Sequence, residues 1–380
     1  MDRRVALLLF AAGWGANHFS SLLIVYRRDL GLSPSALGIL FGAYALGLVP
    51  GLVLAGRASD RRGRRALVLP SSLLAVAASA VLAFGAEGFS VLLAGRLLFG
   101  LAMGAVMSPG SVWVQELSPP GLGARRATLA LSAGFGLGPV VSGVIAEFAP
   151  APMVLPYVAH GLAMAAALVG ARAVPETAPR ARRDAPAGGP REAAPVIRAR
   201  DLGVLVGLVP VAPWAFGFAA VTIAILPGLM RPHVARPVLY SAFVIVTTLS
   251  AGVLVQSLVR RIGRHADLVG LAAGLGGLLV ASHAVAVASP NLAFAVAVLV
   301  GIGYGLVMTS GLTEVGARVP QDARGTAVGL YYVLTYVGFA LPFIHATLAK
   351  RWGDAPTLRA AAVVALASLL ARALASVRRR

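Results

Sequence analysis

Long apolar runs alternate with short polar breaks along the whole of this 380-residue chain. Most runs hold about twenty residues or more, so a helix rising about 1.5 Å per residue would cross the roughly 30 Å hydrocarbon layer of a membrane. Membrane barrel strands alternate polar and apolar positions instead, and an open sheet would leave backbone groups unpaired in lipid. The pattern therefore predicts an all-α membrane protein. The twelve predicted transmembrane helices span residues 5–26, 34–56, 66–86, 90–114, 124–148, 153–174, 202–228, 237–259, 267–288, 291–315, 325–348 and 355–377.

The charged residues give this arrangement an orientation. They make up only 12% of the chain, about half the roughly 25% of a soluble domain. A net charge of +19 would suggest a nucleic-acid partner in a soluble protein, but these arginines form short clusters between apolar runs, so no nucleic acid is expected. With the N-terminus inside, twenty-five arginines lie in inner segments and seven basic residues in outer ones. This asymmetry predicts a multi-pass protein of the inner (plasma) membrane with both termini cytoplasmic.

One segment interrupts the hydrophobic pattern. Residues 175–200 are rich in proline, glycine and charge, which is typical of a linker. We therefore predict an N-terminal six-helix bundle at 1–174, a cytoplasmic linker at 175–200 and a C-terminal six-helix bundle at 201–380.

The two halves echo each other at an offset of about 200 residues. Trp14 corresponds to Trp214, and the Gly100-Leu-Ala-Met-Gly104 sequence corresponds to Gly301-Ile-Gly-Tyr-Gly305. Two pseudo-symmetric bundles are typical of transporters that bind a substrate between the halves, near the membrane midplane.

Residues 56–65, Gly-Arg-Ala-Ser-Asp-Arg-Arg-Gly-Arg-Arg, lie between the second and third runs. Gly56 would let the second helix pack closely on a neighbour, and Gly63 would supply a turn with positive φ. The arginines would hold the loop at the cytoplasmic surface, where they can contact anionic lipid headgroups. The decapeptide resembles the conserved loop between helices 2 and 3 of the major facilitator superfamily. The whole chain resembles a bacterial, twelve-helix, drug-efflux or antiporter-like member of it.

The resemblance implies a conformational latch. In the family, the aspartate at the position of Asp60 contacts the cytoplasmic start of helix 11, where the helix dipole favours an anion. The alternative is that the arginines only set the orientation of the chain in the membrane and that the glycine only makes a turn. Arg260 stands where a second-half loop would carry an aspartate, so no second latch is expected. Glu116, followed by Arg126, resembles the loop that partners the latch, although Glu116 could equally be a solvated loop charge. The latch residues are Gly56, Asp60, Arg61, Gly63, Arg64, Arg65, Glu116 and Arg126.

The fifth predicted helix carries a second resemblance. Gly134, Gly138, Pro139 and Gly143 match the family's Gly-Pro antiporter motif, with Ser142 replacing one glycine. Glycines one turn apart make a flat face for a neighbouring helix, and the proline frees a backbone carbonyl. The resemblance implies export in exchange for an ion. The alternative is ordinary packing of small residues.

Arg96 is predicted to lie inside the fourth helix. A charge at that depth is costly unless it faces a cavity or a partner, and Arg96 resembles the arginine of the family's fourth-helix motif. Its partner could be Glu147, a carbonyl, a water or an anionic substrate. Snorkelling of the side chain to the outer surface is the alternative.

Proton coupling requires a titratable group in the pathway. His18, beside Asn17 in the first helix, and Glu314, near the inner end of the tenth, are the candidates. His160 lies near an outer end, where we expect a structural role.

The expected substrate cavity is largely apolar, although each of its residues could instead serve packing. It comprises Trp14, Asn17, His18, Tyr44, Arg96, Met103, Trp214, Tyr304, Tyr332 and Tyr336. There is no cysteine, nucleotide loop, nucleophile constellation or metal-ligand cluster, so we expect no enzyme, cofactor or metal. The expected function is secondary transport by alternating access, as a monomer, with proton-coupled export of small, partly apolar molecules. The alternatives are an importer (symporter or uniporter) of an organic anion or sugar-like solute, and a non-transporting sensor on the same fold.

Overall fold

The computed structural model describes residues 1–120, 122–177 and 199–377. Every regular element in these ranges is helical. The first part of the chain forms α1 (Asp2–Asp29), α2 (Pro34–Arg62), α3 (Arg64–Ala83), η1 (Gly85–Glu87), α4 (Phe89–Leu117), α5 (Gly123–Phe148) and α6 (Leu155–Ala171). The second part forms α8 (Ala199–Leu208), α9 (Pro213–Ala220), η2 (Val221–Ile225), α10 (Leu226–Met230), η3 (Arg231–His233), α11 (Pro237–Gln256), α12 (Val259–Ile262), η4 (Gly263–His265), α13 (Ala266–Ala286), α14 (Leu292–Arg318), α15 (Gln321–Tyr336), η5 (Val337–Ala340), α16 (Leu341–Trp352) and α17 (Asp354–Val377).

The described helices are long and apolar enough to make this a membrane protein. Eleven helical segments of the described chain could each span a bilayer, and α6 is apolar but shorter, at 17 residues. A helix satisfies all its backbone hydrogen bonds internally, which is what a chain in lipid requires.

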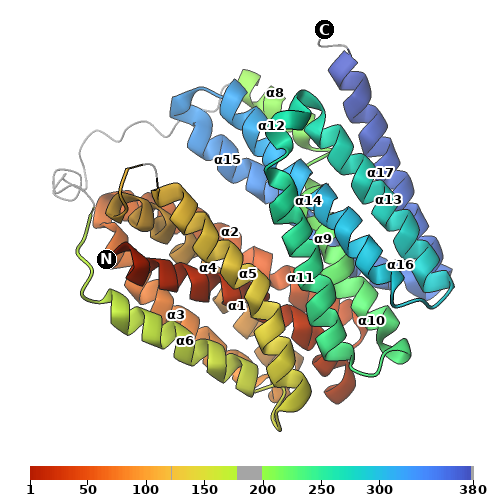
Figure 1. The fold of residues 1–380 in the computed structure, drawn as a ribbon, viewed down its shortest axis with the longest axis horizontal. Coiled ribbons are helices and arrows are strands. Elements are labelled where there is room, and N and C mark those ends of the chain that lie inside the picture. Colours follow the sequence, from red (N-terminus) through yellow and green to blue (C-terminus); the bar gives the residue numbers. More distant parts are fainter. Residues whose placement is uncertain (121, 178–198, 378–380) are drawn as a thin grey trace. The chain divides into compact units, whose positions relative to one another are not determined.

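The chain divides into two compact units, Met1–Gly189 and Pro190–Arg380 (Figure 1). In the first unit, α2 packs on α4, α1 on α5, and α3 on both α4 and α6. In the second unit, α11 packs on α14, and α13 packs on both α14 and α17. The same neighbour pattern therefore occurs in each unit at equivalent places along the chain.

The helix ends of the first unit follow from local sequence. Ser33 caps α2 by accepting a hydrogen bond from the Ala36 amide at 3.2 Å, and Pro34 occupies the first turn, where no amide hydrogen is needed. Gly63 separates α2 from α3 with φ of 102°, the positive value that the sequence predicts. A side chain at this position would strain the backbone.

Two glycines bring the backbones of α2 and α4 together. A methyl group added at Gly100 would collide with the Tyr44 carbonyl oxygen, and one at Gly104 would collide with that of Leu48. Close backbone contact of this kind holds helices together in lipid, where burying apolar side chains gives little gain.

Two predicted spans are confirmed as apolar segments long enough to cross a bilayer, but each is interrupted within its length. The span predicted at 202–228 is divided into α8, α9, η2 and α10, with a turn at 209–212 that contains Pro210. Prolines at 210 and 213 remove amide hydrogens that an unbroken helix would use. Within it, η2 is a π-helical turn, and the buried Thr222 accepts a hydrogen bond from Thr248 at 2.8 Å. The span predicted at 325–348 is likewise divided by the 3₁₀ turn η5, just before Pro342.

Replacing Gly100 with alanine should destabilise the protein, because the added methyl group has no space against α2. We expect a loss of about 1–3 kcal/mol in the free energy of unfolding, measured by denaturation of the purified protein in detergent. Gly170→Ala is the matched control, since nothing lies within 4 Å of a methyl group at that position of α6. Equal stability of the two variants would show that the α2–α4 contact is looser than described.

Candidate functional site

The turn between α2 and α3 is held by an acid that the sequence did not reveal. The Glu176 carboxylate accepts hydrogen bonds from the backbone amides of Arg64 and Arg65, at 2.9 and 3.0 Å. These amides are at the start of α3, where the helix dipole favours a negative charge. Glu176 lies more than 100 residues further along the chain, so no local pattern could have indicated it. The segment after α6 therefore caps α3.

Arg64 is nearly buried and joins α3 to α4. Its guanidinium donates to the Ser59 hydroxyl at 2.8 Å and to the Glu116 carboxylate at 3.3 Å. Glu116 also accepts a hydrogen bond from the Thr177 hydroxyl. The structure thus brings Glu116 to one of the loop arginines, as the sequence suggested.

The other predicted latch residues lie in separate surroundings. Arg61 is exposed, and Gly56 lies where α2 passes the Ser108 hydroxyl of α4. Arg126 forms an ion pair with Asp2 at the start of α1, a partner that the sequence did not suggest. The side chain of Asp60 lies outside the described residues.

The glycine-proline segment of α5 packs directly on α1. Methyl groups at Gly134 and Gly138 would collide with the backbone at Phe10 and Trp14. Pro139 has no amide hydrogen to give to the carbonyl of Phe135, and Asn17 donates to that carbonyl instead, in a long contact of 3.5 Å. Buried Gly143 lies one turn beyond Pro139.

Two further hydrogen bonds join α1 to α5. Ser21 donates to the Pro139 carbonyl at 2.9 Å, and the Trp14 indole donates to the Ser142 hydroxyl at 3.2 Å. The serine that replaces a motif glycine is therefore the hydrogen-bond partner of a predicted cavity residue.

Arg96 lies inside the first unit, with 2% of its surface exposed. Its Nε donates to the Leu40 carbonyl at 3.0 Å and its Nη2 to the Phe41 carbonyl at 3.3 Å, both on α2. The guanidinium also lies 4.3 Å from the ring centre of Phe19 and 4.6 Å from that of Tyr44. Of the partners that the sequence left open, the structure gives carbonyls, together with aromatic faces that attract a cation.

His18 lies in an aromatic cluster next to this arginine. Its ring is fully buried and stacks on that of His160, with ring centres 5.0 Å apart. Phe99 and Tyr157 lie at 4.9 and 4.8 Å. Met103 is fully buried in the same unit. His160 is thus part of the surroundings of His18, which its predicted place near a helix end did not indicate.

Two of the predicted cavity aromatics of the second unit, Tyr304 and Tyr336, stack on Phe216. This residue, which the sequence analysis did not select, lies 6.0 Å from Tyr304 and 4.8 Å from Tyr336 between ring centres. Tyr332 is partly buried on the same helix as Tyr336. Trp214 is buried, and its indole donates to the Ser368 hydroxyl of α17 at 3.0 Å, so it serves packing within the unit.

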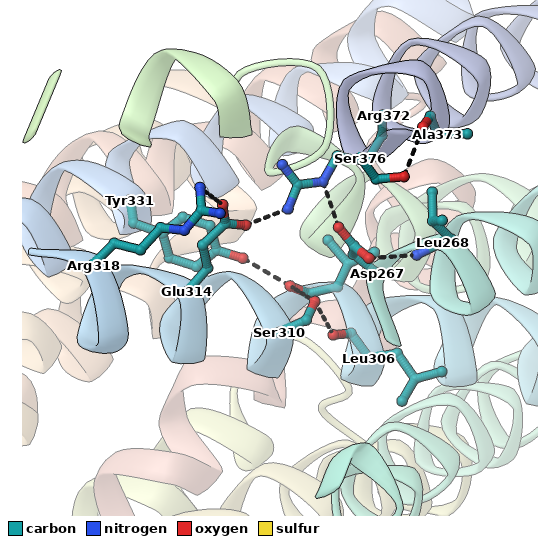
Figure 2. A network of polar contacts seen from close by, with 11 residues as sticks. Asp267, Leu268, Leu306, Ser310, Glu314, Arg318, Tyr331, Arg372, Ala373 and Ser376 are labelled. Atoms are coloured by element: carbon teal, nitrogen blue, oxygen red, sulfur yellow. Dashed lines mark hydrogen bonds and ion pairs between the residues drawn. The ribbon is translucent and has the colours of Figure 1, made fainter. Parts of the chain in front are cut away.

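Glu314 belongs to a network of charges in which Asp267 is buried, Glu314 and Arg372 are partly buried and Arg318 is exposed (Figure 2). Arg372, on α17, lies between Glu314 of α14 and Asp267 of α13 and forms an ion pair with each, at 2.5 Å to Asp267. Arg318 binds Glu314 from one turn further along α14, at 2.9 Å. Figure 2 shows the Arg372 side chain reaching both carboxylates. The network ties together three helices.

No pattern in the sequence indicated a role for Asp267. Arg372 was counted only among the inner arginines that predict the orientation in the membrane. Their partners lie 58 to 105 positions away along the chain. Among the described residues, no group of three or more histidines and acids is placed to hold a metal ion.

Comparison with known families decides the family. The model of the major facilitator superfamily matches residues 5–342. The chain belongs to this superfamily. Together with the eleven candidate spans, this match identifies an integral multi-pass membrane protein.

Individual relatives match over shorter lengths. The chain is 31% identical over 153 residues to the quinolone resistance protein NorA of Staphylococcus aureus strain Mu50, and the match covers 39% of each protein. It is 29% identical over 107 residues to the glucose transporter GlcP of Staphylococcus epidermidis, covering 28% of this chain and 24% of the relative. The chain thus matches well under half the length of these curated relatives.

Solved structures share the fold over the full length. A nucleoside transporter, NupG (D323A mutant), has a TM-score of 0.81 at 10% identity, and the match covers 98% of this chain and 99% of that one. A D-xylose-proton symporter has a TM-score of 0.74 at 17% identity, covering 97% and 96%. Identities this low show the fold alone.

Replacing Glu176 with glutamine should weaken the cap of α3. The amide keeps the size of the side chain but loses its charge, so we expect a loss of about 1 kcal/mol in unfolding free energy, measured by denaturation in detergent. Glu87→Gln, at an exposed position of η1, should leave stability unchanged. A Glu176→Gln protein as stable as the control would contradict the capping role.

Replacing Arg372 with methionine should leave the buried Asp267 and the partly buried Glu314 without their shared cation. We expect a loss of about 2–4 kcal/mol in unfolding free energy, measured in the same way. Arg318→Met is the matched control, because it removes an ion pair to the same Glu314 from a side chain that is 44% exposed. Its loss should be about 0.5 kcal/mol, and equal losses would contradict the network.

Proposed function

We propose that this protein is a proton-coupled exporter of small, partly apolar molecules that works by alternating access. Its twelve helices would form two pseudo-symmetric six-helix bundles, residues 1–174 and 201–380, joined by a linker at 175–200. The recurrence of the same helix neighbours in the two units supports this plan. The protein would be a monomer in the inner (plasma) membrane with both termini cytoplasmic, have no nucleic-acid partner and catalyse no chemical reaction.

The observation that carries export is the packing of α5 on α1. Gly134 and Gly138 allow backbone contact along the turn of α1 from Phe10 to Trp14, one turn before His18. The freed carbonyl before Pro139 is met by Asn17, the neighbour of the proton candidate. A bend or rotation of α5 at this contact would move α1 with it, so the segment that resembles the antiporter motif is mechanically joined to the helix that carries His18.

Proton coupling is proposed to lie in the first unit, at His18. Glu314, the other candidate, has two arginine partners, and a proton on it would weaken both ion pairs. We therefore assign His18 the coupling role and Glu314 a role in holding α14 to α17.

The substrate surface is proposed to be aromatic. The stack of Phe216, Tyr304 and Tyr336 offers flat apolar faces with hydroxyl groups at their edges, which suits small, partly apolar molecules. The relative NorA is named for quinolone resistance, and a quinolone has this character.

A second candidate function is import of an organic anion or a sugar-like solute. Arg96 favours it, because its described partners are carbonyls and aromatic rings, which leaves its charge without an acid. The similarity to a glucose transporter points the same way.

Flux in proteoliposomes separates the two functions. With a proton gradient imposed, an exporter should move a fluorescent quinolone against the direction of proton flow. An importer should instead move labelled glucose or an organic acid in the direction of proton flow. Quinolone movement along the proton flow would contradict the proposed antiport.

Replacing Asp60 with asparagine should cripple transport while leaving membrane insertion intact, because Asp60 is the proposed latch between the halves. We expect at least a tenfold fall in flux, the equivalent of about 1.4 kcal/mol. Asp29→Asn, which removes an acid from the far end of α1, is the control and should transport normally. Unchanged flux in the Asp60→Asn protein would refute the latch.

A further inference from the structure

The cluster around Arg96 in the first unit holds one histidine with both ring nitrogens hydrogen-bonded, and two residues that each leave a buried polar atom without a partner among the described residues. The satisfied residue is His160. Its Nε2 lies 3.0 Å from the Ala11 carbonyl, and since a carbonyl only accepts, Nε2 must carry the hydrogen. Its Nδ1 then accepts from the Ser79 hydroxyl at 2.8 Å. His160 is therefore a neutral ring with both nitrogens bonded, and it has no capacity left for a ligand.

His18 is different. Its Nδ1 lies against the Gly15 carbonyl, so this nitrogen carries the hydrogen and donates it. Its Nε2 then has a free lone pair, and this buried atom has no hydrogen-bond partner among the described residues. The neutral ring thus leaves one acceptor open in a core where its exposed fraction is 0%.

Arg96 leaves the complementary group open. Nε and Nη2 donate to carbonyls of α2, whereas Nη1 is buried and has no acceptor among the described residues. Buried polar groups normally have partners, so an open donor and an open acceptor in one cluster call for an occupant.

The two open groups belong to the same cluster. Phe19, the neighbour of His18, lies under the Arg96 guanidinium, and Tyr157 contacts the His18 ring and interacts electrostatically with Arg96. Arg96 also acts electrostatically on His18 itself. The described titratable or charged side chains around the pair are Tyr26, Tyr44, Tyr157 and His160. None of them is an acid.

Charges on α5, the remaining neighbour of α1, lie at its ends. Arg126 pairs with Asp2 at the start of α1, and Glu147 acts on Arg28 at the far end. A proton on His18 would therefore place a second cation beside Arg96 without a described acid to balance either, which is costly in a buried site.

We propose that His18 and Arg96 form one buried site that takes up a proton and a small anion together. The proton binds the Nε2 lone pair of His18, and the anion accepts hydrogen bonds from that new N–H and from Nη1 of Arg96. With His18 neutral, a water can fill the site, accepting from Arg96 and donating to His18. The anion is either the carboxylate of a solute or an inorganic anion such as chloride. This inference rests on the proposed coupling role of His18 and adds the co-ligand.

The site has a quantitative signature. If only the protonated form binds the anion, the apparent dissociation constant rises about tenfold for each pH unit above the range in which the site is protonated. A surface site for anions would lack this dependence.

The test measures anion binding to the purified protein at several pH values between about pH 5 and pH 8. Binding is detected as a rise in the protein's thermal stability. Acetate and chloride are the probes, each titrated against isethionate, a sulfonate, at constant ionic strength. We expect stabilisation by at least one of them at low pH, weakening about tenfold in affinity per pH unit. Acetate alone would indicate a solute carboxylate, and chloride an inorganic anion. Stabilisation by neither, or equally at all pH values, would overturn the proposal.

Variants assign the effect to the two residues. His18→Gln should abolish the pH dependence, and Arg96→Gln should weaken anion binding at least tenfold at low pH. Arg96→Lys, which keeps the charge, provides a folded alternative and should retain part of the binding. His283→Gln, at an exposed position of α13, is the control and should behave as the wild type. If the anion affinity of the His18→Gln protein still depends on pH, the site is refuted.

This experiment is independent of transport. A protein that shows linked binding but moves no quinolone would retain the site and lose the proposed exporter function. A protein that exports quinolone but shows no pH-linked anion binding would retain the proposed exporter function and lose the site.

Discussion

Close backbone contact at glycines is the constraint on which the first unit depends. In lipid, apolar side chains gain little by leaving one apolar environment for another, so helices are held by van der Waals contact and hydrogen bonds. Gly100 and Gly104 bring α4 onto α2, and Gly134 and Gly138 bring α5 onto α1. These contacts place Arg96 within reach of α2 carbonyls and Asn17 within reach of α5. The polar arrangement of the core is therefore a consequence of the missing side chains.

Charge networks join helices in both units, and two of the three equivalent positions carry charges of opposite sign. In the first unit, Arg64 on α3 meets Glu116 on α4, and Glu176 follows α6. In the second unit, the acid Asp267 is on α13 and Arg372 is on α17. The sequence repeat placed Arg260 where an acid would be, and the structure shows where acids of this half are used instead. The charges are exchanged between α3 and α13 and between the segment after α6 and α17, whereas α4 and α14 both contribute a glutamate, Glu116 and Glu314.

The sequence predicted the helical membrane fold and most span positions, because continuous apolar runs of this length have few other solutions. It also predicted the turn at Gly63 and the pairing of Glu116 with a loop arginine. It could not indicate Glu176, Asp267 or Phe216, whose partners lie far away along the chain and in no repeating pattern. Breaks within spans were missed for a related reason: hydropathy measures polarity and does not record the amide hydrogens that Pro210, Pro213 and Pro342 lack.

The π-helical turn at Val221–Ile225 has a consequence for the segment that follows it. One residue added to an α-helix rotates everything beyond it by about 100°, since a turn takes 3.6 residues. Side chains of α10 therefore occupy a different angular sector from the one that continuing α9 would give them. Deleting a single residue there would turn Met230 and its neighbours away from the core while leaving the hydropathy profile almost unchanged. The seventh span thus carries information in its residue count that its composition does not contain.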